Sequence, residues 1–193
     1  MPRQIRSILL FVLLTLALYP LGVICHEIIG HGLVGVLAGG KMIRAEILGL
    51  EIWPRPRWIG WQGHYGNCDL DGIPTRTGEQ CMALAGALST WCVALIAVTL
   101  LCVRRWSRPT RWILICLSLW WIDLFTYTLP TWGLRRSILW GAVYSEPYDA
   151  AVGLGMPGTA FQTFVAVTSV ILVLALRRGL RRQRGSADSP ARQ

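Results

Sequence analysis

The stretch Cys25-His26-Glu27-Ile28-Ile29-Gly30-His31-Gly32 decides how this chain is organised. It places two histidines and a glutamate inside an apolar run that extends from Ile8 to Ala38. Ionisable side chains at membrane depth are costly, so such residues mark functional sites. Histidine is the commonest metal-binding side chain, and a glutamate beside the first of two such ligands can act as a general base toward water. The stretch therefore predicts a metal site within a hydrophobic helix.

The composition is typical of a membrane protein with several spans. Of the 193 residues, 53% are hydrophobic and 15% are charged, and the mean hydropathy is +0.47. The net charge of +9 would suit nucleic acid, but the arginines lie beside apolar segments, where they predict contact with the lipid bilayer instead. The six cysteines form no C-x-x-C pair, so we expect neither a disulfide framework nor a thiolate zinc site.

Four long apolar segments predict four transmembrane helices. They run over residues 7–38, 80–103, 112–129 and 159–176. We expect the first segment to be retained, because Ile24 before Cys25 makes a poor cleavage site. The sequence predicts one membrane domain over residues 1–180, followed by a disordered basic tail over residues 181–193.

Residues 41–76 differ from the rest of the chain, because apolar and polar side chains alternate there. The pattern predicts two or three short strands with turns, and residues 67–72 predict a turn-rich loop. An open sheet edge cannot lie in lipid, so these strands must lie at the interface or against the helices. The predicted fold class is membrane all-α, with four transmembrane helices and a small interfacial β-hairpin or sheet between helices 1 and 2.

Basic residues predict the orientation of the helices. If both termini lie inside, twelve arginines are cytoplasmic and seven lysines or arginines are outside. Cytoplasmic loops carry the excess of Lys and Arg. We therefore expect an integral, multi-pass membrane protein with both termini cytoplasmic.

The spacing of the histidines departs from the usual H-E-x-x-H pattern of zinc peptidases. His26 and His31 are five residues apart, so a regular α-helix would separate them by about 140°. A π-bulge inserts one residue into a turn and would bring both imidazoles to one side, and Gly30 is a suitable place for it. We predict such a break between the histidines. The alternative is that these polar residues hold neighbouring helices together by hydrogen bonds.

A catalytic zinc site needs three protein ligands and one open position. Asp123 is the only acid within the third apolar segment, and on the predicted topology it lies at a similar depth to His26. Glu146 and Asp149 precede the fourth segment and could reach the site from a re-entrant turn. Asp123 is the first choice as third ligand and Glu146 the second, whereas His64 carries no supporting pattern.

Taken together, these features resemble the site-2-protease-like family of intramembrane zinc metallopeptidases, in its small bacterial form. The resemblance covers roughly residues 8–155. The matching features are His26-Glu27 with Gly30-His31, Gly39-Gly40 before strand-like sequence, Ala85-Gly86-Ala87 opening the next helix, an acid-bearing third segment and an acidic turn after Pro130. The chain departs from the family in the extra residue between its histidines and in lacking an Asn…Pro…Asp-Gly motif.

The resemblance implies that His26 and His31 bind Zn²⁺, that Glu27 is the catalytic base, and that an aspartate, here Asp123, completes the site. The implied activity is hydrolysis of peptide bonds in or near membrane-spanning segments, in the bacterial cytoplasmic membrane, on a membrane protein or peptide. Residues 42–53 are expected to hold such a substrate by strand-edge pairing. Two alternatives are a catalytically inactive scaffold or regulator of the same family, and a small metal-binding, transporter-like protein.

Overall fold

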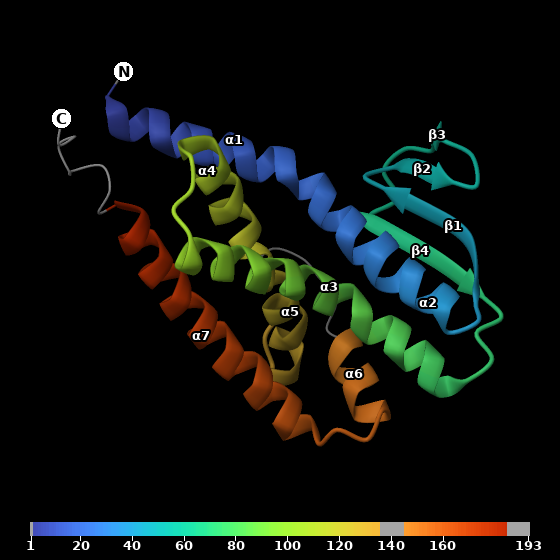
Figure 1. The fold of residues 1–193 in the computed structure, drawn as a ribbon. Coiled ribbons are helices and arrows are strands. Elements are labelled where there is room, and N and C mark those ends of the chain that lie inside the picture. Colours follow the sequence, from blue (N-terminus) through green and yellow to red (C-terminus); the bar gives the residue numbers. More distant parts are fainter. Residues whose placement is uncertain (1, 136–144, 185–193) are drawn as a thin grey trace.

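The computed structural model describes residues 2–135 and 145–184. Within these ranges the chain is mostly helical, and a small antiparallel sheet lies against the helices (Figure 1). Four stretches of helix in this part are long and apolar enough to cross a membrane, as the sequence predicts. They are Gln4–Leu37, Arg76–Val103, Arg108–Trp132 and Gly158–Gln183.

The first stretch changes its helical type part-way along. It consists of α1 (Arg3–Ile24), the π-helix η1 (Cys25–Leu33) and α2 (Val34–Leu37). Pro20 lies inside α1 without ending it. Gly39 follows with a φ of +95°, which L side chains rarely adopt, and the chain then enters the sheet. The predicted break between His26 and His31 is confirmed, and it extends over a full π-helix.

The second stretch is the single helix α3 (Arg76–Val103), which begins where the Thr75 hydroxyl accepts a hydrogen bond from the Gly78 N–H at 3.0 Å. The third is composite: α4 (Arg108–Leu117), η2 (Ser118–Trp120), α5 (Trp121–Thr128) and η3 (Leu129–Trp132). The remaining helices are α6 (Glu146–Gly153) and α7 (Gly158–Arg184).

The helix α7 corrects one sequence prediction. It continues to Arg184, so the expectation of a disordered tail from residue 181 is wrong for residues 181–184. The buried Gln183 side chain explains the difference, because its amide donates hydrogen bonds to the backbone carbonyls of Leu101 and Arg104 at the end of α3. Residues 185–193 lie outside the described part of the chain.

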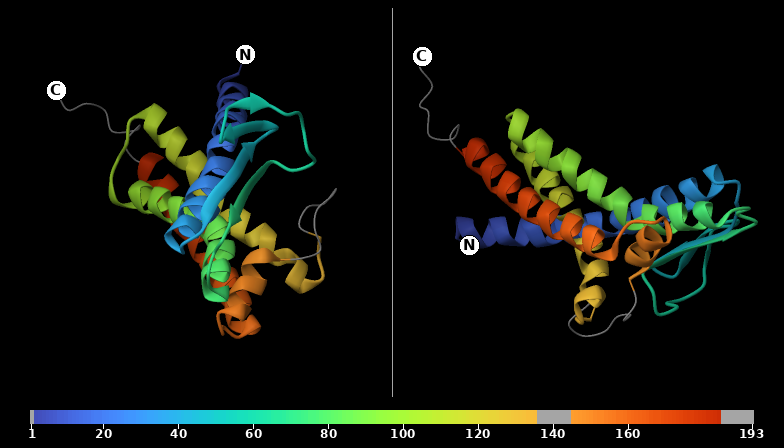
Figure 2. Two further views of the ribbon diagram at one scale, coloured as in Figure 1. Left: turned by 90° about the vertical axis from the view of Figure 1, so that its right-hand side faces the viewer. Right: turned by 90° about the horizontal axis from the view of Figure 1, so that it is seen from below.

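The described part of the chain contains one four-stranded antiparallel sheet, in the order β3-β2-β1-β4. Its strands are β1 (Lys41–Ile47), β2 (Leu50–Trp53), β3 (Arg57–Trp58) and β4 (Gly66–Asp71). The sheet lies beside α1 and α2, at the opposite end of the molecule from the start of α1 and the end of α7 (Figures 1 and 2).

One expectation about the strands is wrong, and a second is wrong for part of its segment. Most of the predicted turn-rich loop at residues 67–72 belongs to β4, which pairs with β1 from Lys41↔Asp71 to Ile47↔Gly66. Long-range pairing overrides the local turn signal there. The strand β1 is paired on both sides at Ala45–Ile47, and β2 is paired on both sides at Leu50 and Glu51, so this part of residues 42–53 is not a sheet edge. Met42 and Arg44 pair with β4 alone. The edges belong to β3 and β4.

The helix α3 is the centre of the packing. It contacts η1 and each of the helices α4, α5, α6 and α7. One apolar cluster joins Ala87 of α3 to Leu124 of α5 and Phe161 of α7, and a second joins Leu101 of α3 to Leu114 of α4. This arrangement places the middle of α3 directly against the π-helix that carries the two histidines.

Candidate metal centre

The π-helix brings the two imidazoles together. In a π-helix the backbone bonds connect residues five apart, so His26 and His31 stand one above the other. Their ring centroids are 4.9 Å apart, and each residue is only 6% exposed. The extra residue between the histidines is therefore accommodated by the helix type, and both rings lie on one side.

Two glycines let α3 approach this side closely. A Cβ added to Gly30 would lie 2.5 Å from the Cα of Gly86, so neither helix has room for a side chain at the crossing. A Cβ added to Gly86 would lie 2.3 Å from Nε2 of His31 and 2.7 Å from Nε2 of His26. Both Nε2 atoms therefore point into the same small region next to Gly86.

The opposite nitrogen of each ring is held by a hydrogen-bond acceptor. Nδ1 of His26 donates to Oδ2 of Asp123 at 2.6 Å, and the Thr90 hydroxyl donates to the same oxygen at 2.8 Å. Nδ1 of His31 donates to the carbonyl oxygen of Met82 at 2.9 Å. Because the acceptors place the protons on Nδ1, both Nε2 atoms carry a lone pair. This is the arrangement of metal-binding histidines, whose other ring nitrogen donates to a carboxylate or carbonyl.

Tyr127 is a site residue that the sequence analysis missed. Its hydroxyl lies 3.5 Å from Nε2 of His26, and its ring stacks on that imidazole with centroids 5.3 Å apart. Tyr127 is buried and lies four residues after Asp123, on the same face of α5. That spacing is a signal from which Tyr127 could have been found once Asp123 was singled out.

Besides Asp123, the structure brings two sequence candidates to this place, Glu27 and Glu146, and leaves two elsewhere, Asp149 and His64. Oε2 of Glu146, the first residue of α6, lies 3.9 Å from Nε2 of His31. Glu27 is close enough to interact with the charges of His26, Asp123 and Glu146. In contrast, Asp149 is exposed on α6, and His64 pairs with Glu46 in the sheet.

Glu27 leans toward the edge strand β4. A Cβ added to Gly66 would lie 2.6 Å from Cγ of Glu27. Cys68 on the same strand is half-buried, and burial, with the negative charges of Glu27 and Asp69, raises the pKa of its thiol to about 11. Since thiolate is the form that binds zinc, Cys68 is a poor ligand near neutral pH.

The donor chemistry of the histidine pair fits zinc, whereas a third ligand is not at coordination distance. Within residues 2–135 and 145–184, no three His, Cys, Asp or Glu side chains are grouped closely enough to hold an ion. Two imidazole nitrogens with fixed tautomers and a nearby carboxylate are nevertheless the components of a catalytic zinc site. Glu146 would have to move toward His31 to complete it.

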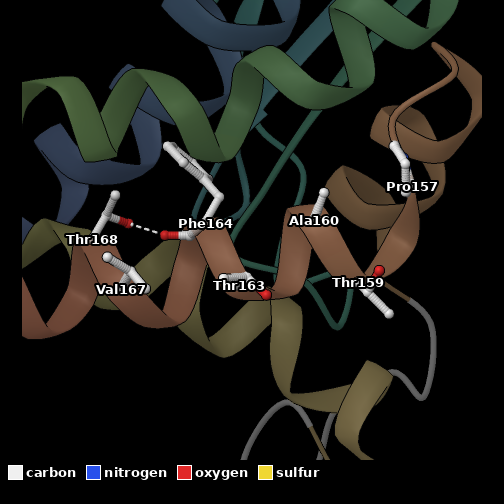
Figure 3. Close-up of a pocket in the computed structure, with 7 residues that line it drawn as sticks. All are labelled: Pro157, Thr159, Ala160, Thr163, Phe164, Val167 and Thr168. Atoms are coloured by element: carbon white, nitrogen blue, oxygen red, sulfur yellow. Dashed lines mark hydrogen bonds between the residues drawn. The ribbon is translucent and has the colours of Figure 1, made fainter.

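A hollow on the surface of α7 is a different feature. It is lined by Pro157, Thr159, Ala160, Thr163, Phe164, Val167 and Thr168 (Figure 3). These side chains include no acid, base or metal-binding group, so the hollow contributes nothing to the histidine site.

In comparisons with known proteins, no family model, no curated protein and no solved structure matches this chain.

Proposed function

We propose that this chain is an intramembrane zinc metallopeptidase that hydrolyses peptide bonds in or near membrane-spanning segments. One observation carries the proposal: a π-helix turns His26 and His31 to one side, where both Nε2 atoms converge next to Gly86. The acceptors on both Nδ1 atoms, Asp123 and the Met82 carbonyl, supply the outer partners that metal-binding histidines use.

The proposal places the four apolar stretches across a bilayer, with both termini cytoplasmic and the sheet at the opposite interface. Their outward side chains support this placement, since Ile8 and Leu16 of α1 are 63% and 65% exposed and Leu174 of α7 is 58% exposed. Contiguous exposed apolar surface of this kind is rare on a water-soluble monomer. Cysteine labelling that found residues 177–184 on the outer side of the membrane would contradict the orientation.

Zinc held by His26 and His31 would act as a Lewis acid that polarises the scissile carbonyl and activates water. For the third ligand, the contacts favour Glu146, because its carboxylate lies on the Nε2 side of His31. Asp123 lies on the Nδ1 side of His26 and is suited to orient that ring. The expectation that Asp123 itself binds the metal stays a prediction.

The remaining residues have separate roles in the proposed reaction. Glu27 accepts a proton from water and passes it to the leaving amine. The Tyr127 hydroxyl, 3.5 Å from Nε2 of His26, donates a hydrogen bond to the carbonyl oxygen as negative charge develops there. The edge strand β4 carries Gly66 beside Glu27, so an extended substrate segment added to β4 would pass close to the base.

Metal content and cleavage in membranes test the function. The full-length chain and its Glu27→Gln variant are expressed in a bacterial host and purified for zinc analysis, and new protein N-termini in the host membranes are mapped by mass spectrometry. We expect zinc in both proteins, and new N-termini within apolar segments only with the parent. A parent chain without zinc, whose membranes match those of Glu27→Gln, would refute the proposal.

A catalytically inactive, zinc-binding scaffold is the second candidate. The observation that favours it is the 3.9 Å separation between Glu146 and His31, which leaves the site without a third ligand at coordination distance. Zinc in both proteins, with identical N-termini in both sets of membranes, would identify this function instead.

A further inference from the structure

One end of the molecule is lined by arginines from three parts of the chain. They come from the start of α1, the link between α3 and α4, and the last turns of α7, which lie at the same end (Figures 1 and 2). The exposed members are Arg6, Arg104, Arg105, Arg108, Arg177, Arg178, Arg181 and Arg182. The sheet, with its buried Glu46 and Glu51, lies at the opposite end (Figure 1).

Hydrogen bonds hold two of these parts together. The Gln183 side chain donates to the Arg104 carbonyl at 2.6 Å and accepts from the Trp106 N–H at 3.1 Å. Nη1 of Arg182 donates to the Cys102 carbonyl at 2.7 Å, and Nη1 of Arg111 donates to the Gln183 carbonyl at 3.1 Å. The arginines of α7 and of the α3–α4 link therefore form one surface with a defined geometry.

Carboxylates do not neutralise this surface in the described part of the chain. Each ion pair found there involves Arg44, Arg57 or a histidine, and none involves an arginine of this end. Arg104 instead lies over the Trp106 ring, 5.1 Å from its centroid. The positive charge is therefore left to an external anion.

The arginines also border apolar surface. Val103 is 59% exposed beside Arg104, and Leu174 is 58% exposed one turn before Arg177 and Arg178. A tryptophan at such a boundary is typical of the membrane interface, and Trp106 occupies that position. A nucleic acid would cover the arginines but would leave the adjoining apolar side chains in water.

We propose that this arginine surface binds the phosphate groups of anionic phospholipids in the cytoplasmic leaflet. The inference rests on the proposed membrane placement but is independent of zinc and of catalysis. Guanidinium groups bind phosphate oxygens through paired, charge-assisted hydrogen bonds. Basic residues of α7 and of the α3–α4 link then share headgroups, and this contact holds the arginine end at a constant depth.

Native mass spectrometry of the full-length protein in detergent tests the proposal. The probes are phosphatidylglycerol and phosphatidylcholine with identical acyl chains. The surface variant is Arg105→Gln/Arg108→Gln/Arg178→Gln/Arg181→Gln. The control variant removes the same charge from exposed residues elsewhere, as Lys41→Gln/Arg55→Gln/Arg76→Gln/Arg135→Gln.

We expect the parent and the control variant to bind phosphatidylglycerol more tightly than phosphatidylcholine. The surface variant should lose up to about 600-fold of this preference, since each of its four arginines contributes about fivefold near an anionic surface. Inorganic phosphate at the same concentration should not displace the lipid. Size-exclusion profiles that match the parent confirm that the variants are folded.

Three results would overturn the inference. They are no lipid preference in the parent, a preference that survives in the surface variant, and equal losses in the surface and control variants. Binding of an RNA oligonucleotide by the parent without any preference for phosphatidylglycerol would identify the arginine surface as a nucleic-acid site. A chain recovered outside the membrane fraction would instead contradict the membrane placement itself.

Discussion

Replacing Gly86 by alanine tests the convergence of the two histidines most directly. The new methyl carbon would lie 2.3 Å from Nε2 of His31 and 2.7 Å from Nε2 of His26. Ordinary van der Waals contact begins at 3.4 Å, so Nε2 of His31 must move away from the new methyl group by about 1 Å. Metal–ligand distances are held to within about 0.2 Å, so this displacement is too large for the pair to share an ion unchanged.

The loss of metal should exceed the loss of stability. Mutating a residue that only orients a metal ligand already lowers metal affinity by about 10–100-fold. Gly86→Ala would displace the ligand atoms themselves, so we expect it to weaken zinc binding by about 100-fold or more. Overpacking costs about 1–3 kcal/mol, but alanine also gains about 1 kcal/mol over glycine in a helix. The free energy of unfolding should therefore change by no more than about 2 kcal/mol.

Chelator competition measures the zinc affinity, and thermal unfolding in detergent measures the stability. Gly22→Ala is the matched control, because its Cβ would lie 3.4 Å from the Trp120 ring, in ordinary contact. Gly30→Ala should behave differently from Gly86→Ala, since its Cβ would meet the backbone of α3 at 2.5 Å and force the helices apart. A Gly86→Ala protein that binds zinc as tightly as the parent would refute the convergence of both Nε2 atoms on one ion.

Three further predictions concern the surroundings of the pair. Glu27→Gln should retain zinc and lose about 10²–10⁴-fold in turnover, because an amide cannot accept the proton; zinc analysis beside cleavage rates checks it, and equal turnover would remove Glu27 as the base. Glu146→Gln should release zinc, whereas Asp123→Asn should weaken binding by about 10–100-fold, and the reverse order would make Asp123 the ligand. Alkylation of Cys68, followed by peptide mass spectrometry, should be about 100-fold slower at pH 8 than that of a thiol with a pKa of 9.0, and should accelerate until the pH passes about 11. A rate at pH 8 equal to that of an ordinary thiol would contradict the burial of Cys68 beside Glu27.

Local sequence predicts the four long helices and the break in the first one. Apolar runs of sufficient length specify helices wherever they pack, and the four observed stretches fall where these runs lie. The five-residue spacing of His26 and His31 predicts the π-helix once both imidazoles are assigned to one site, because a regular α-helix would send the rings to different sides. Both features depend on residues close together in the chain.

The sequence predicted few of the contacts between distant segments. The sequence of residues 67–72 predicts a turn, but most of them pair with β1, because a strand is stabilised by its partner more than by its own composition. Asp123 was expected near His26, but which imidazole nitrogen it would meet depends on how α5 packs across α3. The same packing brings Tyr127 to His26 and sets Gly86 against both Nε2 atoms. Periodicity assigns a residue to a face of its helix, whereas only tertiary packing determines which atoms of another helix meet that face.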